Sequence, residues 1–313
     1  MEAGPVGARP DAWDREPVSV PDAVMTPEAM PSFVAIGELM VDVAATGRGH
    51  EARITVSPGG SAANAAVWAS ALGAQTAVVG RVGADQPGRM VRSALLERGV
   101  AALVTEDADL PTGTFLTIEG AEGARVLADF GANGRFGPDD LPGSLTADAV
   151  LVSGYLLLHD SSQAGARAAI ERAEAGLVAV DAASRALLEA CGRERFLALA
   201  AGATALLAGE EEASLVSGQT GAEAAASALG ERFRLVAVTR GPAGAVAVLD
   251  GESTTAAPAA AEAGAGTGAG DAFAAGLLVA LGRGLPLQEA LGQGCSAGAA
   301  AVRRRWPPSE MLN

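Results

Sequence analysis

The residues with the clearest capacity for chemistry lie near the C-terminal end of the sequence, in the segment "GAGTGAGDAF" (residues 264–273). Four glycines within seven residues precede Asp271, and an apolar run that predicts a helix follows. Glycine lets the backbone approach a ligand closely, because it has no Cβ atom. If Gly268, Ala269 and Gly270 form the first turn of that helix, their N–H groups and the helix dipole favour a phosphoryl group. Asp271 would then accept a proton from a substrate hydroxyl, a contribution of about 10²–10⁴ in rate.

Two other interpretations of this segment compete with the phosphate-binding turn. Gly264, Gly266 and Ala269 satisfy the dinucleotide pattern G-x-G-x-x-G/A, but that pattern directly follows a strand and has an acidic residue about 20 positions on. Here the preceding "TTAAPAAAEA" does not predict a strand, which disfavours a dinucleotide site. A flexible glycine loop, with Asp271 as an ordinary helix N-cap, stays open at this point.

Lysine is absent from the sequence, and all 22 basic side chains are arginine. A P-loop, a protein-kinase nucleotide site and Schiff-base chemistry each need a lysine, so all three are excluded. Phosphate groups must therefore be bound by backbone N–H groups, helix N-termini, arginine or a metal ion. The net charge of −15 at pH 7 argues against nucleic acid and against an anionic membrane surface as partners.

Histidines and cysteines are too few for the common sites built from them. With only His50 and His159, a multi-histidine zinc site is disfavoured, and no G-x-S-x-G segment supports a Ser-His-Asp triad. Cys191 and Cys295 fit no metal spacing, which agrees with a reducing compartment. The run "AFAAGLLVALG" is too short to span a bilayer, and no secretory signal is visible. We therefore expect a soluble, cytoplasmic protein.

Strand-like and helix-like segments alternate along most of the sequence, beginning with "FVAIG" at residues 33–37. This alternation predicts an α/β fold in which helices cover both faces of a mostly parallel sheet. Two segments, at about residues 41–57 and 111–130, break the alternation. They predict short strands joined by glycine turns, typical of a lid. Residues 1–31 are rich in proline and acidic residues and predict a disordered extension, so Met25 or Met30 would serve equally well as the start.

Further glycine-rich segments accompany the C-terminal turn. The first is "SPGGSAANAAVWASALGAQTAVVGRVGADQPG", and the second is "VTRGPAG", which follows directly on a predicted strand. In this order, and together with "TGAGDAF", they resemble the signature segments of the ribokinase-like (PfkB) carbohydrate kinases. The resemblance is collinear and covers roughly residues 33–305. Kinases of this family use no P-loop, which agrees with the missing lysines.

The resemblance implies a ribokinase-like three-layer α/β/α sandwich with a mostly parallel central sheet and a small β-strand lid. The kinase domain would cover residues 32–306, and residues 307–313 would form a C-terminal tail. Asp271 would be the catalytic base, and Gly268, Ala269 and Gly270 would form the anion hole for the transferred phosphoryl group. The residues implied to bind acceptor hydroxyls are Asp42, Gly59, Gly60 and Asn64.

The resemblance also implies where the nucleotide lies. Its phosphates would follow Thr239, Gly241 and Gly244, and its adenine would be bordered by residues 258–262 and by the helix near Cys295. The implied cofactors are ATP and Mg²⁺, with K⁺ as a further activating cation. The lid would close over the sugar, exclude water and mediate a homodimer.

Each of these positions also has an ordinary structural interpretation. Asp42 could be a solvated residue at a strand end, Asn64 a residue on a helix surface, and Thr239 a β-branched strand terminus. His159 and Asp160 are expected to be a helix-start pair without catalytic meaning. The acidic run at residues 210–212 is typical of a helix N-terminus.

Two departures from the family pattern concern cations. Where relatives carry N-x-x-E, this chain has Gly209 and Glu212, so the glutamate that organises Mg²⁺ remains but the asparagine is lost. Where relatives carry an aspartate at the start of the glycine turn, near a monovalent-cation site, this chain has Ala265. The resemblance therefore implies that this chain binds both Mg²⁺ and K⁺ differently from its relatives.

The expected activity is transfer of the γ-phosphoryl group of ATP to a hydroxymethyl group of a small sugar. The alternatives are a nucleoside kinase of the same family and a weakened homologue that binds sugar or nucleotide. A sugar-acid kinase would need a cation near the acceptor carboxylate, for which Arg125 or Arg135 is available.

Overall fold

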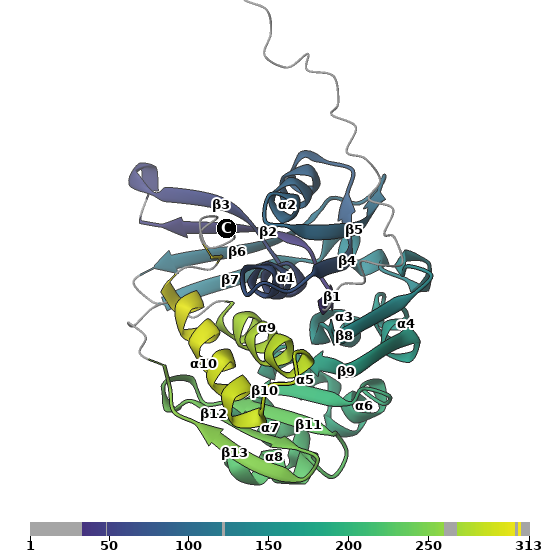
Figure 1. Ribbon diagram of the computed structural model, residues 1–313. Helices are drawn as coiled ribbons and strands as arrows, with labels where there is room; N and C mark the ends of the chain where they lie inside the picture. Colours follow the sequence, from purple (N-terminus) through teal and green to yellow (C-terminus); the bar gives the residue numbers. More distant parts are fainter. Residues whose placement is uncertain (1–32, 48, 121–122, 260–267, 304–305, 308–313) are drawn as a thin grey trace, which may run out of the picture.

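A nine-stranded sheet forms the centre of the molecule (Figure 1). The computed structural model describes residues 33–47, 49–120, 123–259, 268–303 and 306–307. The order of the strands is β13-β12-β11-β10-β9-β8-β1-β4-β5, and neighbours from β11 to β5 are parallel, whereas β12 and β13 add an antiparallel edge. The strands are β1 (Phe33–Ile36), β4 (Thr76–Gly83), β5 (Val100–Asp107), β8 (Leu145–Val152), β9 (Ala173–Asp181), β10 (Ala205–Gly209), β11 (Leu235–Thr239), β12 (Ala245–Leu249) and β13 (Glu252–Ala256).

Helices cover both faces of this sheet, which confirms the predicted three-layer α/β/α fold. One face packs against α1 (Ser61–Ala71), α2 (Gln86–Leu96), α9 (Ala269–Gly282) and α10 (Leu287–Arg303). The other face packs against α3 (Gly154–Leu158), α4 (Gln163–Arg172), α5 (Arg185–Cys191), α6 (Arg193–Leu199), α7 (Glu210–Ser217) and α8 (Ala222–Leu229). Central strands read as nearly continuous apolar runs because both of their faces are buried. None of the helices in the described ranges is long and apolar enough to cross a bilayer.

The two segments that break the α/β alternation form a small second sheet, in the order β3-β2-β6-β7 (Figure 1). Its strands are β2 (Met40–Thr46), β3 (Arg53–Gly59), β6 (Gly113–Gly120) and β7 (Gly123–Asp129). Each predicted segment supplies one antiparallel pair, and β2 and β6 join the pairs in parallel. The predicted second sheet is therefore confirmed.

Two polar side chains tie this small sheet to the central one. Asp85 caps α2 by accepting from the Gly88 N–H at 2.8 Å, and it also accepts from the N–H and hydroxyl of Thr112, just before β6. The buried Asn133 forms hydrogen bonds to both the N–H and the carbonyl of Leu39, which joins β1 to β2. The connections that lead into β2 and β6 are thus both fixed, so the strands of the small sheet leave the core in a defined direction.

Some short elements differ from the prediction. The helices α3, α5 and α8 were not predicted, because helices of five to eight residues carry little periodic signal. The prediction of no strand at the start of "TTAAPAAAEA" was wrong, since β13 covers Glu252–Ala256. This strand is an antiparallel edge paired with β12, so it does not form the βαβ unit of a dinucleotide site. The prediction for residues 1–31 lies outside the described residues.

Glycines bring α9 and α10 into close contact. The ring of Phe273 on α9 lies against Gly294 of α10, and a Cβ at Gly276 would lie 2.9 Å from the backbone oxygen of Gln293. Backbone atoms cannot move aside as a flexible side chain can, so Gly276 has no room for a methyl group. By contrast, a Cβ at Gly292 in the same helix pair would meet nothing within 4 Å.

We expect Gly276→Ala to lower the free energy of unfolding by about 1–3 kcal/mol, because the helices must separate to admit the methyl group. Gly292→Ala is the matched control and should raise the free energy of unfolding by up to about 1 kcal/mol, through helix propensity alone. Chemical denaturation of the two variants and the parent measures both effects. Equal effects of the two substitutions would contradict the close-packing explanation.

Candidate active site

The candidate site lies at the carboxyl edge of the central sheet. The chain order reverses around β1, which lies between β4 and β8, and ligands of open α/β sheets bind outside the carboxyl ends of strands at such a point. The strand ends across this edge, in the order of neighbouring strands, carry Glu38 after β1, Ser153 after β8, Asp181 on β9, Gly209 on β10 and Thr239 on β11. The first turn of α9 brings Asp271 to the same place.

Asp271 is held by two side chains from α1. It is the third residue of α9, and the N-cap is Gly268 in the left-handed conformation, at a φ of 87°. The Ser61 hydroxyl donates to Oδ1 of Asp271 at 2.9 Å, and the Asn64 amide donates to Oδ2 at 2.7 Å. Asp271 is therefore not an ordinary N-cap. Its carboxylate instead faces the segment "GGSAAN" across more than 200 residues of sequence.

The glycine pair before α1 is required by close contacts. Gly60 has a φ of 101°, and a Cβ there would lie 2.2 Å from the Glu38 backbone oxygen. A Cβ at Gly59 would lie 1.8 Å from Oδ2 of Asp42, on the neighbouring strand β2. Asp42 is only 5% exposed. The predicted residues Asp42, Gly59, Gly60 and Asn64 thus lie in adjacent structure, and Asp42 is not a solvated strand end.

Glu38 is a buried carboxyl group beside this cluster. Its Oε1 accepts from the Ser61 N–H at 2.8 Å, and its Oε2 accepts from the Ser153 hydroxyl at 2.7 Å. Burial raises the pKa of Glu38 to about 7, with a smaller contribution from the charge of Asp271. The bond to Ser153 links the ends of β1 and β8, the two strands at which the chain order reverses.

Asp181 adds a second carboxyl group with a raised pKa at the end of β9. Burial raises the pKa of Asp181 to about 8, and the negative charges of Asp271, Glu38 and Glu212 contribute. Burial likewise raises the pKa of Tyr155, with Asp181 as the next cause. These groups therefore form one electrostatic unit, in which each negative charge opposes the ionisation of the others.

The residues predicted for the nucleotide and metal also lie together. Gly209 pairs with Thr239 in the β10–β11 register, and Glu212 lies in the first turn of α7 directly after β10. Gly244 has a φ of 88°, and a Cβ there would lie 2.1 Å from the Ala256 oxygen. Gly241 has a φ of 52° and open space around its Cβ position. Gly244 is therefore required for the backbone path of this turn, whereas the absence of a side chain at Gly241 leaves the turn open to a ligand.

The structure shows what takes the place of the asparagine that is absent at position 209. A Cβ at Gly209 would lie 2.3 Å from Oε2 of Glu212, so the glutamate carboxylate occupies the space that a side chain at 209 would need. No cluster of three or more His, Cys, Asp or Glu suited to a metal ion is found in the described ranges. Magnesium typically binds one or two carboxylates together with substrate phosphates, and the single carboxylate of Glu212 suits that mode.

Several predicted residues take other roles or lie outside the described ranges. Arg135 pairs with Asp107 and Asp109, so its charge is already engaged. Arg125 is exposed on β7, and the strand register places it on the face of the small sheet opposite Asp42. Neither arginine supports a carboxylate site beside Asp42. Residues 260–267, which include Gly264, Ala265 and Gly266, lie outside the described residues.

Several side chains of the site were not predicted from the sequence, among them Glu38, Asp181, Ser61 and Trp306. Glu38 lies two residues after β1 and Asp181 is the last residue of β9, a position at which parallel sheets carry functional groups, so that signal was present. Ser61 lies within the recognised segment "GGSAAN". Trp306 donates its indole N–H to Oδ1 of Asn64 at 2.7 Å, and nothing in the local sequence pattern around it predicts this contact.

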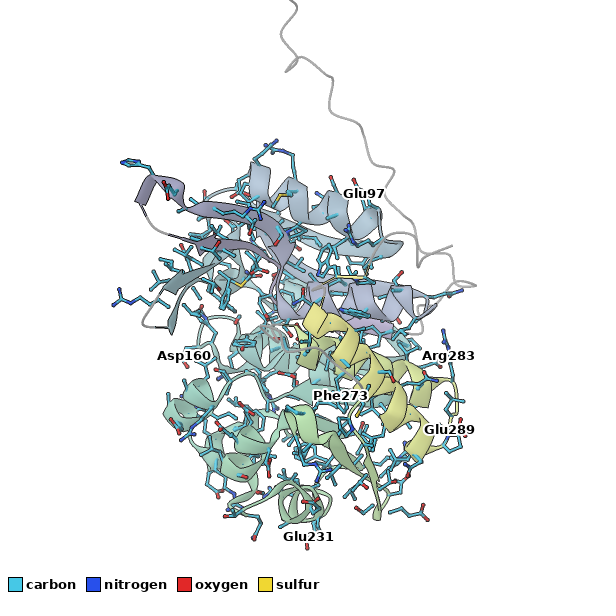
Figure 2. All side chains as sticks on the ribbon, turned by 90° about the vertical axis from the view of Figure 1, so that its left-hand side faces the viewer. Glu97, Asp160, Glu231, Phe273, Arg283 and Glu289 are labelled. Carbon is cyan, nitrogen blue, oxygen red and sulfur yellow. The ribbon has the colours of Figure 1, made fainter. Side chains whose placement is uncertain are left out.

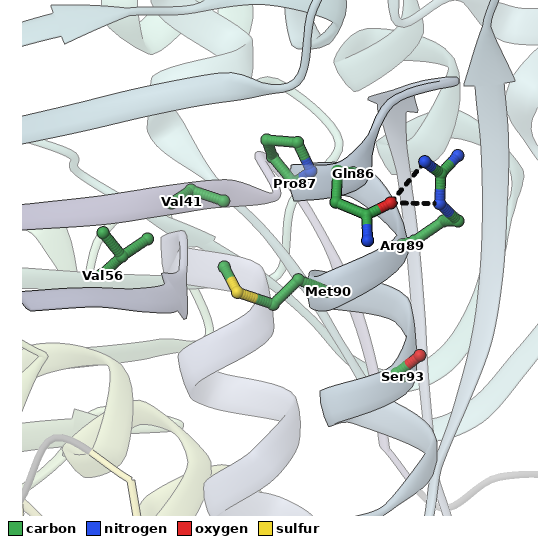
Figure 3. Close-up of a pocket in the computed structure, with 7 residues that line it drawn as sticks. All are labelled: Val41, Val56, Gln86, Pro87, Arg89, Met90 and Ser93. Atoms are coloured by element: carbon green, nitrogen blue, oxygen red, sulfur yellow. Dashed lines mark hydrogen bonds between the residues drawn. The ribbon is translucent and has the colours of Figure 1, made fainter. Parts of the chain in front are cut away.

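A separate cavity of about 560 Å³ lies between the small sheet and α2 (Figure 3). It is largely apolar and is lined by Val41, Val56, Gln86, Pro87, Arg89, Met90 and Ser93. Because side chains alternate along a strand, Val41 faces this cavity while Asp42 faces the opposite side of β2. The cavity is therefore distinct from the candidate site.

The comparisons with known proteins agree with this geometry. The family described as pfkB family carbohydrate kinase matches residues 30–307. A fructokinase from Klebsiella pneumoniae is 31% identical over 266 residues, which are 80% of this chain and 85% of the relative.

Solved structures share the architecture. An adenosine kinase from Sinorhizobium meliloti superposes with a TM-score of 0.81 over 90% of this chain and 97% of its own, at 21% identity, which supports the fold. An aminoimidazole riboside kinase from Salmonella enterica, solved with aminoimidazole riboside and an ATP analogue, has a TM-score of 0.76 over 90% and 98%, at 25% identity. The chain belongs to the pfkB family of carbohydrate kinases, and it is a sugar kinase that transfers a phosphoryl group to an alcohol group.

Proposed function

We propose that the protein transfers the γ-phosphoryl group of ATP to a hydroxymethyl group of a small sugar, with Asp271 as the base. The observation that carries this proposal is the position of Asp271. Its carboxylate lies in the first turn of α9 and accepts hydrogen bonds from Ser61 and Asn64. A base at the N-terminus of a helix can take a proton from the acceptor while the same helix end stabilises the transferred phosphoryl group.

The N-terminal turn of α9 would bind the transferred group. Gly268 turns the chain into the helix in the left-handed conformation, and Ala269 and Gly270 present N–H groups of the first turn. Gly270 is exposed, and a Cβ there would meet nothing within 4 Å, so a phosphoryl group has room to approach. Each N–H group directed at developing charge contributes about 3 kcal/mol, which substitutes for the absent lysine.

The acceptor would bind between α1 and the small sheet. Asp42, Gly59, Gly60 and Asn64 present carboxylate, backbone and amide groups suited to sugar hydroxyls. Because the Klebsiella pneumoniae relative is a fructokinase, D-fructose is the first acceptor to test. A nucleoside kinase is the second candidate, favoured by the structural likeness to aminoimidazole riboside kinase.

The nucleotide would lie over the ends of β10 and β11. Thr239, Gly241 and Gly244 would follow its phosphates, and Cys295 on α10 is close enough to Arg240 for the arginine charge to affect the thiol pKa. The helix α10, which is proposed to border the adenine, therefore lies near the turn of Gly241 and Gly244, which is proposed to bind the phosphates. Glu212 would hold Mg²⁺, and the ion would neutralise phosphate charge when bound. K⁺ activation would depend on residues that include Ala265.

A weakened homologue that binds sugar or nucleotide is the alternative from another class. Gly209 and Ala265 motivate it, because Glu212 lacks the usual asparagine partner and the aspartate usual at the start of the glycine turn is absent. Release of ADP with D-fructose, D-ribose, 2-dehydro-3-deoxygluconate and adenosine, with and without K⁺, separates the two. Nucleotide binding without turnover on any of these acceptors would favour the binding protein.

The small sheet would act as a lid and as a dimer interface. The register places Ile54, Val56, Ile118 and Leu127 on the face opposite Asp42, with exposed fractions of 64%, 56%, 40% and 61%. Four exposed aliphatic side chains on one sheet face form a patch that a second copy can cover symmetrically. The opposite face remains directed at the acceptor.

Asp271→Asn should reduce turnover at least a hundredfold, because the amide cannot accept the proton, while ATP affinity changes little. ADP release with the best acceptor of the panel and calorimetric titration of ATP measure the two quantities. Asp250→Asn, which changes an aspartate in a surface ion pair with Arg234, is the matched control and should keep full activity. Retained turnover in Asp271→Asn would overturn the base assignment.

The free energy of unfolding should fall as pH rises from about 5 to 8, because folded Glu38 keeps its proton to about pH 7 while the unfolded carboxyl loses it near 4.5. Glu38→Gln should remove the part of this dependence that belongs to Glu38, up to about 3 kcal/mol across that range, while the raised pKa of Asp181 sustains the remainder. Urea denaturation at a series of pH values measures the slope. Glu231→Gln, at an exposed surface position far from the small sheet (Figure 2), should keep the parent slope. An unchanged slope in Glu38→Gln would show that Glu38 ionises freely in the folded state.

Leu127→Arg should convert the proposed homodimer to a monomer, because a charge at the centre of an apolar interface is costly to bury. Thr55→Arg, on the opposite face of the same sheet, is the control and should leave the mass unchanged. Light scattering after size exclusion at tens of micromolar protein measures the mass of each. A monomeric parent protein under these conditions would refute the dimer.

A further inference from the structure

The last described residues of the chain return to the site. Trp306 follows α10, and its indole packs with the core residues on the α1 face of the central sheet. Its Nε1–H donates to Oδ1 of Asn64 at 2.7 Å, and Asn64 in turn donates from Nδ2 to Oδ2 of Asp271 at 2.7 Å. A continuous line of two hydrogen bonds therefore runs from Trp306 through a single amide to the carboxylate proposed as the base.

The two partners of Asn64 permit one amide orientation only. An indole N–H can only donate, and an ionised carboxylate can only accept. The amide must therefore present its oxygen to Trp306 and its nitrogen to Asp271. Asn64 is 2% exposed, so water does not readily replace a lost partner. Without the indole donor, the amide oxygen loses its partner, and a rotated amide would place that oxygen against the Asp271 carboxylate.

Trp306 is itself held by groups outside the site. The guanidinium of Arg98 lies over the indole ring, with Cζ 4.6 Å from the ring centroid, a cation–π contact. The carbonyl of Arg98 accepts from the Ser70 hydroxyl at the far end of α1, which fixes this residue to the same helix as Asn64. Pro307, the next residue, is buried. Packing on the α1 face thus positions the indole without help from a substrate, and the contact with Arg98 adds stability.

We propose that Trp306 is a positioning residue for phosphoryl transfer, which acts through Asn64 to hold Asp271 in its reactive orientation. This inference rests on the proposed function, in which Asp271 is the base. The effect of Trp306 requires its N–H group, whereas packing and the contact with Arg98 require only its ring.

The experiment separates these two contributions. Trp306→Phe keeps an aromatic ring beside Arg98 and removes the N–H group, and it should lower kcat about tenfold while KM for ATP stays within twofold. Arg98→Met removes the cation and keeps the indole N–H, so it should lower the denaturation midpoint with kcat within twofold of the parent. The assay measures ADP release with the acceptor that turns over fastest among D-fructose, D-ribose, 2-dehydro-3-deoxygluconate and adenosine. Equal loss of kcat in both variants would reduce Trp306 to a structural role and overturn the proposal.

A double-mutant cycle with Asn64→Ala tests the route of the effect. If Trp306 acts through Asn64, Trp306→Phe should change kcat less than twofold in the Asn64→Ala background. A tenfold loss in both backgrounds would overturn the proposal even if Asp271 is the base. Retained activity of Asp271→Asn, in contrast, would reject the base assignment while the cycle still reports whether Trp306 and Asn64 are coupled.

If Trp306→Phe fails to fold, the tryptophan analogue in which sulfur replaces the indole N–H can be incorporated at position 306. This analogue keeps the shape of the ring system, so the same tenfold loss is expected. Parent-like kcat with the analogue would overturn the proposal.

Discussion

The pair of hydrogen bonds from Ser61 and Asn64 to Asp271 is the contact on which the site depends. It joins α1, near the start of the fold, to α9, near its end, at distances of 2.9 Å and 2.7 Å. Both helices pack on the same face of the central sheet, and their N-terminal turns reach its carboxyl edge together. Helix N-termini concentrate unpaired N–H groups, so one contact brings two turns suited to binding anions to one place. The geometry proposed for catalysis therefore follows from the packing of these helices.

Negative charge is the main difficulty that this site must overcome. A protein with a net charge of −15 and no lysine binds a substrate that is itself a polyanion. Two features reduce the repulsion. The pKa values of about 7 for Glu38 and about 8 for Asp181 keep these groups partly protonated at neutral pH. Helix N-termini and backbone N–H groups supply positive potential without any cationic side chain. The bound cation would supply the remaining compensation.

Local sequence patterns predicted the parts of the protein that depend on local rules. The three-layer fold follows from the alternation of apolar strands and helices, and the small sheet follows from two segments without a helix between their strands. Gly59, Gly60 and Gly268 were singled out through the family resemblance, and a positive φ or a close contact explains why glycine occupies these positions. Glu38 and Asp181 were missed, although their places at strand ends carried a usable signal.

Other features could not be predicted because they depend on tertiary contacts. Asn133 fixes Leu39 across 94 residues, and Trp306 reaches Asn64 across 242 residues. No periodicity in the sequence marks such residues, since their contacts join elements that are distant along the chain. The position of the Glu212 carboxylate beside Gly209 likewise depends on the direction in which α7 leaves the end of β10. Sequence patterns indicate which elements form, but these long-range hydrogen bonds depend on how the elements pack.

The high glycine content and low aromatic content of the chain help to fix the positions of the side chains in its site. Aromatic residues are only 4% of the sequence, and 41 residues are glycine. Small residues let α9 and α10 approach until backbone atoms nearly touch, as at Gly276 and Gly294. Close packing of this kind leaves few alternative arrangements, because any separation of the helices would open voids. The position of Asp271 in the first turn of α9 is thereby fixed to that of α10, whose end leads to Trp306. The close packing of small residues between α9 and α10 thus constrains the positions of both Asp271 and Trp306. The hydrogen bonds through Asn64 therefore join two groups that the backbone already holds in place.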